Sequence, residues 1–205
     1  MKIYRNLILF LLSAISYLSV SADEPGTAIM KRCAEKFSNA PSVNVEFAIA
    51  GADGAANGSL LMSKKLFRIT TPDASIWFDG TTQWTYFASA NEVNITEPTG
   101  EELMESNPFE LISSADKNFK CKALKSSASS DIIELTPKHK GMSISSARIT
   151  INKTTGWPTA MIITFEGGNT TSVSIGKVTV GKSVAASQFK YNPKLYPKAQ
   201  LVDLR

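Results

Sequence analysis

Histidine and cysteine are almost missing from this chain. Its 205 residues include one histidine, His139, and two cysteines, Cys33 and Cys121. A structural zinc site needs four nitrogen or sulfur ligands, so a site built from these residue types lacks ligands. His139 lies in the basic, turn-like stretch from Thr136 to Gly141, which favours a solvated turn residue over a catalytic base. We therefore predict neither a metal site nor catalysis by histidine.

The motifs of other common enzyme classes are missing as well. The sequence contains no Gly-x-Ser-x-Gly elbow, no glycine-rich phosphate loop and no dinucleotide-binding fingerprint. Glu101, Glu102 and Glu105 lie close together, but carboxylates at the start of a helix suit the helix dipole. The net charge of +4 is too small to favour binding to nucleic-acid phosphates. We expect a protein that is not an enzyme, needs no cofactor and binds no nucleic acid.

The first 22 residues have the three parts of a secretory signal. Lys2 and Arg5 precede an apolar run, and Val20-Ser21-Ala22 forms a cleavage site of small residues before Asp23. The apolar run is short and interrupted by serines, which argues against a retained membrane anchor. We expect cleavage after Ala22, export, and a single mature domain of residues 23–205.

Export makes a disulfide permissible, and two cysteines are the smallest set that forms one. The sequence does not say whether Cys33 and Cys121 come within bonding distance. A disulfide between them and two separately buried thiols both stay open.

Most of the mature chain has the alternating pattern of half-buried strands. About ten short strands, joined mostly by turn-sized gaps and without regular strand-helix alternation, predict an antiparallel sheet that curls or closes. Two segments break this rhythm. Residues 25–37 have helical spacing, and residues 100–114 begin with acids and contain Asn107-Pro108, as at a helix start. We expect a mainly β fold whose apolar face is covered by these helices.

Apolar residues on the strands define an inward-facing set. Composition alone favours ordinary packing for this set, but a packed core and a ligand cavity require the same residues. The set comprises Phe47, Phe67, Ile69, Trp77, Trp84, Met161, Ile163 and Phe165.

Short motifs follow one another along the mature chain in a characteristic order. They are Gly58-Ser59-Leu60-Leu61-Met62, Leu66-Phe67-Arg68-Ile69, Phe78-Asp79-Gly80, Trp84-Thr85-Tyr86, Asn91-Glu92-Val93, Asn107-Pro108-Phe109-Glu110-Leu111-Ile112, Leu135-Thr136-Pro137-Lys138 and Phe189-Lys190-Tyr191-Asn192. In these motifs and their order, the chain resembles the LolA family of periplasmic outer-membrane lipoprotein carriers.

The resemblance implies a mainly β fold with an α lid, an incomplete, half-open antiparallel β-barrel covered by short helices. Its apolar cavity would receive the acyl chains of a lipoprotein and ferry it from the inner to the outer membrane. The implied partners are acylated lipoproteins or lipid, an inner-membrane lipoprotein-releasing transporter and an outer-membrane acceptor. We expect a monomer in the periplasm.

The resemblance also implies site residues. Phe67 and Ile69 match cavity positions of the family, and the lid is expected at Phe109, Leu111 and Ile112. The full set that we expect to line the lipid-binding cavity is Phe47, Leu60, Met62, Phe67, Ile69, Trp84, Ile163 and Phe165.

One departure from the family concerns how the lid is held shut. In the family, a Lys-Arg-Pro turn precedes the cavity phenylalanine, and its arginine hydrogen-bonds the lid. Here the segment is Ser63-Lys64-Lys65-Leu66-Phe67, so Lys64 or Lys65 would have to act as the latch. A lysine does not reproduce the planar guanidinium fork.

An alternative function is an exported β domain of the same family with a filled core, which binds a protein partner or another lipid in the envelope.

Overall fold

The computed structural model describes residues 25–205 apart from residues 53 and 125, so the predicted signal segment lies outside the described residues. The fold is mainly β, with twelve strands in one sheet and a few short helices. The strands are β1 (Ser42–Gly51), β2 (Gly54–Ser63), β3 (Leu66–Thr70), β4 (Ala74–Phe78), β5 (Gln83–Phe87), β6 (Glu92–Thr96), β7 (Phe119–Ala123), β8 (Ser130–Pro137), β9 (Ile144–Asn152), β10 (Pro158–Phe165), β11 (Thr170–Gly181) and β12 (Gln200–Asp203).

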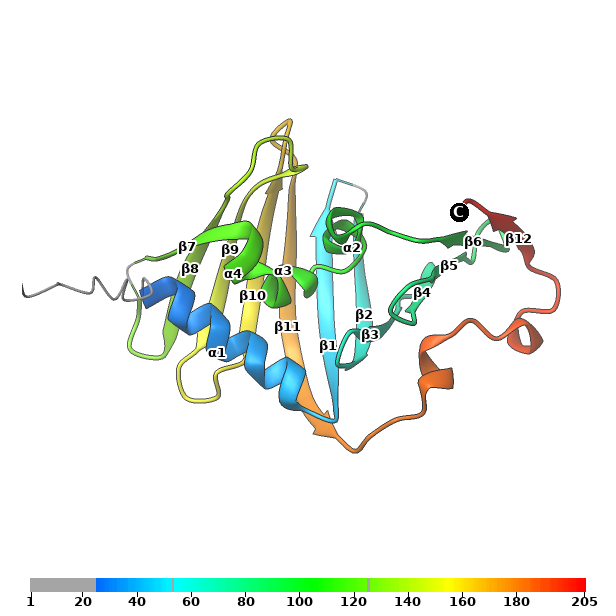
Figure 1. The fold of residues 1–205 in the computed structure, drawn as a ribbon, viewed down its shortest axis with the longest axis horizontal. Helices are drawn as coiled ribbons and strands as arrows, with labels where there is room; N and C mark the ends of the chain where they lie inside the picture. The colour runs from blue at the N-terminus through cyan, green and yellow to red at the C-terminus, as the bar shows by residue number, and fades with distance from the viewer. Residues whose placement is uncertain (1–24, 53, 125) are drawn as a thin grey trace, which may run out of the picture.

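The sheet is open. Its strand order is β12-β6-β5-β4-β3-β2-β1-β11-β10-β9-β8-β7, so β12 and β7 form its two edges. All neighbouring strands pair antiparallel except β12, which pairs parallel with β6. The prediction of a curled antiparallel sheet that stays half-open is therefore confirmed (Figure 1).

The helices cover the inner face of the sheet. Helix α1 (Pro25–Asn39) buries Met30, Cys33 and Phe37, which lie on one helical stripe, and packs against β7. The second predicted helical segment, residues 100–114, forms α2 (Gly100–Ser106) and α3 (Glu110–Ser113), and a third piece that was not predicted, α4 (Ala115–Asn118), follows it. The pieces α3 and α4 pack against α1, and Figure 1 places all three over the sheet. We call residues 100–118, which include α2, α3 and α4, the lid segment.

Alternation along the strands separates two faces. Val43, Val45 and Phe47 of β1 are buried, whereas the intervening Asn44 and Glu46 are exposed. The pairing register carries this inner face across the sheet, and its buried side chains join those of α1 and the lid segment in one hydrophobic cluster. We call this cluster the interior.

The C-terminal segment covers part of the outer face. It contains the 3₁₀ turns η1 (Ala186–Phe189) and η2 (Pro193–Leu195) before β12. Phe189 is fully buried, and the Trp77 ring lies edge-on to Tyr191 and Tyr196 at centroid distances of 5.8 and 5.7 Å. Lys190 forms an ion pair of 3.0 Å with Asp79 in the β4–β5 turn. The C-terminal segment thus lies on the face opposite the interior.

None of the helices in the described part of the chain has the length and apolar character needed to cross a bilayer.

Candidate functional site

Seven of the eight residues expected to line a cavity lie on the inner face. The register aligns Phe47 with Gly58, Leu60 with Ile69, and Met62 with Phe67, so all of these positions point the same way. Ile163 is buried on β10, and Phe165 is partly buried against the interior. The structure therefore brings Phe47, Leu60, Met62, Phe67, Ile69, Ile163 and Phe165 together around one interior.

Trp84 lies on the other face. It pairs directly with Trp77, and Trp77 pairs with Arg68, whose neighbours Phe67 and Ile69 point inward. Because side chains alternate along a strand, Trp84 points toward the side covered by the C-terminal segment. The inner positions of β5 are instead Gln83, Thr85 and Phe87, which makes this end of the interior more polar.

The lid segment fills the space under the sheet. Its side chains Met104, Phe109, Leu111 and Ile112 are at most 3% exposed and belong to the interior. The Phe109 ring lies 6.0 Å from that of Phe47 on the sheet and 6.3 Å from that of Phe37 on α1. The lid segment thus makes contacts with the sheet and α1 that a bound ligand would otherwise make; without either, this space would be empty.

Two polar contacts tie α2 to distant parts of the sheet. The Glu101 carboxylate accepts a hydrogen bond of 2.6 Å from the backbone N–H of Ser143, in the loop between β8 and β9. The Ser106 hydroxyl donates to the Gln83 side-chain carbonyl at 3.0 Å. Glu102 instead closes a capping box with Thr99, which fixes where α2 begins. From the sequence, Glu101 is expected only to suit the helix dipole, because no sequence signal indicates a partner 42 residues away.

Asn107 lies at the junction between α2 and α3. Its side chain is fully buried, and its carbonyl oxygen accepts a hydrogen bond from the Phe109 N–H. Within the described residues, the other side of this amide, Nδ2, has no hydrogen-bond partner. A buried unsatisfied donor costs about 1–3 kcal/mol, which weakens the closed arrangement of the lid segment.

The predicted latch residues lie in the turn between β2 and β3. Lys64 occupies a turn with a positive φ of 56°, and both Lys64 and Lys65 are exposed. In the part of the chain that the structure describes, neither lysine forms a salt bridge or hydrogen bond with the lid segment. Burial raises the pKa of Glu110 on α3, while the Ser113 hydroxyl and the Lys65 charge act in the opposite direction. Lys65 therefore interacts with the lid through its charge.

Cys33 on α1 and Cys121 on β7 are buried thiols rather than the two halves of a disulfide. Of the two arrangements left open by the sequence, the structure has the second. Burial raises the pKa of the Cys33 thiol to about 12, against a smaller opposite effect of the Lys36 charge. Among the described residues, no group of three or more His, Cys, Asp or Glu side chains is arranged to hold a metal ion.

This arrangement predicts the thiol chemistry of the folded protein. Both side chains are at most 2% exposed, and the raised pKa of Cys33 also keeps that thiol protonated, so we expect neither cysteine to react with Ellman's reagent within minutes at pH 8. In guanidinium chloride, which exposes both side chains, two thiols per chain should react. A chain with a disulfide would release none under the same denaturing conditions, and rapid reaction before denaturation would contradict the burial of Cys33.

Comparisons with known proteins agree with the fold. A family model described as "Outer membrane lipoprotein carrier protein LolA" matches residues 15–167. Comparison with curated proteins gives no match. An uncharacterized conserved protein from Thermus thermophilus has a similar structure, with a TM-score of 0.58 and 13% identity over 86% of this chain and 97% of that one.

Two further solved structures are more distant. A LolA superfamily protein from Nitrosomonas europaea has a TM-score of 0.43 and 11% identity, over 81% of this chain and 97% of that one. MucB, in the MucA/MucB complex from Pseudomonas aeruginosa, has a TM-score of 0.44 and 13% identity, over 82% of this chain and 62% of that one. Both scores are too low to support a conclusion about this chain.

Proposed function

The chain belongs to the family of the outer membrane lipoprotein carrier protein LolA, and on that premise we propose that it is a periplasmic carrier of acylated lipoproteins. It takes up the acyl chains between the sheet and the helices and ferries them from the inner to the outer membrane. It acts by binding rather than by catalysis. The observation that carries the proposal is that short helical pieces, and not a second sheet, pack against the inner face of the sheet.

The lid segment has the properties of a plug that a ligand displaces. Its pieces contain only seven, four and four residues, which is too short for helices to be stable without tertiary contacts. Transfer of one acyl CH₂ from water to the interior, in the place of a lid side chain, is favourable by about 0.8 kcal/mol. A ligand chain and the lid side chains Phe109, Leu111 and Ile112 therefore compete for the same surface.

Reversible handover needs two states of similar free energy. The unsatisfied Asn107 amide lowers the stability of the closed state, whereas the Glu101 and Ser106 contacts raise it. In place of the family's arginine, we propose that Lys65 supports closure through its charge on Glu110. Since an exposed charge contributes little, apolar contacts remain the main force that holds the lid.

The filled interior also favours the alternative function. Its lining side chains are almost completely buried, as in a core that never opens. On this alternative, the chain is an exported domain that binds a protein partner or another lipid through its surface. The two functions differ in whether acyl chains reach the interior.

Titration with an uncharged fluorescent acyl ester separates them. We expect saturable binding by the mature chain, because the lid yields to the acyl chain. A synthetic lipopeptide with two or three acyl chains should displace the probe, while the same peptide without acyl chains should not. Absence of saturable binding, or displacement by both peptides alike, would rule out the carrier function.

A further inference from the structure

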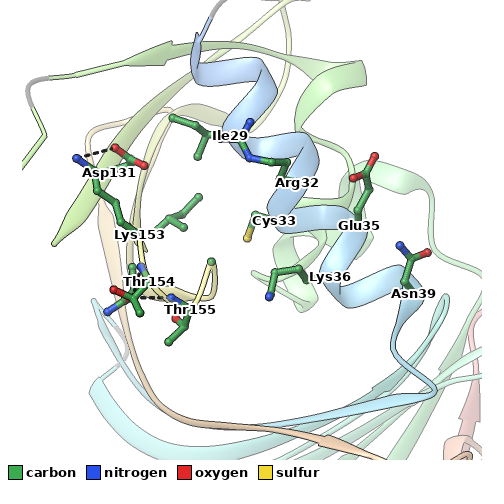
Figure 2. A pocket seen from close by; sticks show the side chains of 13 residues that line it. Ile29, Arg32, Cys33, Glu35, Lys36, Asn39, Asp131, Lys153, Thr154 and Thr155 are labelled. Carbon is green, nitrogen blue, oxygen red and sulfur yellow. Dashed lines mark hydrogen bonds and ion pairs between the residues drawn. The ribbon is translucent and has the colours of Figure 1, made fainter.

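A groove opens beside the interior, between α1 and the turn that joins β9 to β10 (Figure 2). Its volume is about 520 Å³, within the range of about 300–1,000 Å³ that is common for small-ligand sites. One wall consists of the α1 residues Ile29, Arg32 and Lys36, and the opposite wall is formed by residues 152–156. We call this feature the α1 groove.

The floor of the α1 groove is the rim of the interior. Cys33 and Ile151 line the groove, are 1% and 3% exposed, and belong to the same hydrophobic cluster as the lid segment. A chain that leaves the interior at this point meets apolar side chains first and charged side chains next. The groove therefore has the polarity order of an amphiphile, apolar at the floor and charged at the mouth.

The charge that faces the groove is mainly positive. Figure 2 shows Lys36 extending into the opening, whereas Glu35, which also lines the groove, directs its carboxylate away from Lys36. Lys153, on the opposite wall, is already engaged by Asp131 at 3.5 Å and by the Ser127 carbonyl at 2.8 Å. This pair neutralises itself, which leaves Arg32, Lys36 and Glu35 of α1, a set with one net positive charge and no ion pair among the described residues.

Lys36 is held in place by the opposite wall. Its ammonium lies 5.1 Å from the centroid of the Trp157 ring. Its stem passes close to Gly156, where an added Cβ would lie 3.1 Å from the Lys36 Cδ. The lysine is thus positioned by packing, while its N–H donors stay available.

Arg32 and Lys36 lie one helical turn apart. Like charges at this spacing destabilise a helix, and in the described part of the chain no carboxylate lies within salt-bridge distance of either side chain. An anion bound between them would remove the repulsion and accept charge-assisted hydrogen bonds from both. Two uncompensated cations at the end of an apolar floor indicate a ligand with one anionic head.

We propose that the α1 groove binds the anionic headgroup of an amphiphile whose acyl chain lies in the interior. This inference rests on the proposed function, because it requires acyl chains to enter the interior. It adds a ligand preference: an amphiphile with a phosphate, sulfate or carboxylate head binds more tightly than an uncharged one of the same chain length.

The test compares dodecyl phosphate with dodecyl maltoside, below their micelle concentrations, by calorimetry on the mature chain. We expect dodecyl phosphate to bind about tenfold more tightly, as two charge-assisted contacts allow. In R32Q/K36Q this advantage should disappear, while binding of dodecyl maltoside stays unchanged. K120Q/K177Q also removes two positive charges, but from exposed sites on β7 and β11. This variant should still bind dodecyl phosphate more tightly than dodecyl maltoside.

The outcomes separate the two proposals. If neither amphiphile binds, the carrier function fails, and the groove inference fails with it. If both bind equally to the unmodified chain, or if K120Q/K177Q loses the advantage as well, only the groove inference fails. Inorganic phosphate forms the third arm: if it binds as tightly as dodecyl phosphate and loses affinity in R32Q/K36Q, the groove is a site for free anions and the amphiphile assignment is wrong.

Discussion

Replacement of Phe109 by alanine is expected to destabilise the free protein and to tighten its binding of an acyl ligand. Removing a buried phenylalanine typically lowers the free energy of unfolding by about 3–5 kcal/mol. Phe109 is 2% exposed and contacts the rings of Phe37 and Phe47, so we expect a loss in this range. The same loss weakens the closed state with which the ligand competes, which should raise the apparent affinity at least about tenfold.

Phe189 provides the matched control. It is also a fully buried phenylalanine, but it packs in the C-terminal segment on the opposite face. Phe189→Ala should lower stability by a similar amount and leave the affinity for the fluorescent acyl ester unchanged. Urea unfolding and probe titration measure the two effects. Equal changes in affinity for both variants, or loss of binding in Phe109→Ala, would contradict the role of Phe109 as a displaceable plug.

The alternation of the strands predicted most of the interior. A period of two places every second residue on one face, and this alone brought Phe47, Phe67, Ile69 and Ile163 together. Trp77 and Trp84 were expected on this face as well, but both lie on the other face. In β5, Trp84 and Tyr86 belong to the outer face, where the C-terminal segment covers them, whereas Phe87 has the inner register. A single sequence does not reveal which face a distant segment will cover.

The sequence predicted where the lid segment lies along the chain, but not the hydrogen bonds that attach it to the rest of the fold. Asn107-Pro108 and the preceding acids indicated helices, since capping and proline effects act over a few residues. The bond from Ser143 to Glu101 joins residues 42 positions apart. The α1 groove was not predicted, because its two walls are also far apart in the sequence. Without the β9–β10 turn beside them, Arg32 and Lys36 have the pattern of an exposed helix face. Local patterns predict elements, whereas sites depend on how the elements meet.

Gly26→Ala is expected to destabilise the fold, although alanine favours a helix more than glycine by up to about 1 kcal/mol. A Cβ on Gly26 would lie 2.3 Å from the Cys121 carbonyl oxygen and 2.7 Å from the Ala123 nitrogen. Both are backbone atoms of β7 and do not rotate away, so the first turn of α1 must shift. Such overpacking costs about 1–3 kcal/mol, which exceeds the gain in helix propensity.

Gly100→Ala is the matched control for this substitution, because it also lies in the first turn of a helix but has no atom within 4 Å of an added Cβ. It should leave the free energy of unfolding unchanged or raise it slightly. In Gly26→Ala, by contrast, displacement of α1 should also expose Cys33, since this residue faces the interior from the same helix. We expect a lower urea midpoint together with faster reaction of a thiol with Ellman's reagent. Unchanged stability would mean that α1 packs less closely on β7 than the geometry indicates, and that this wall of the interior can move without cost.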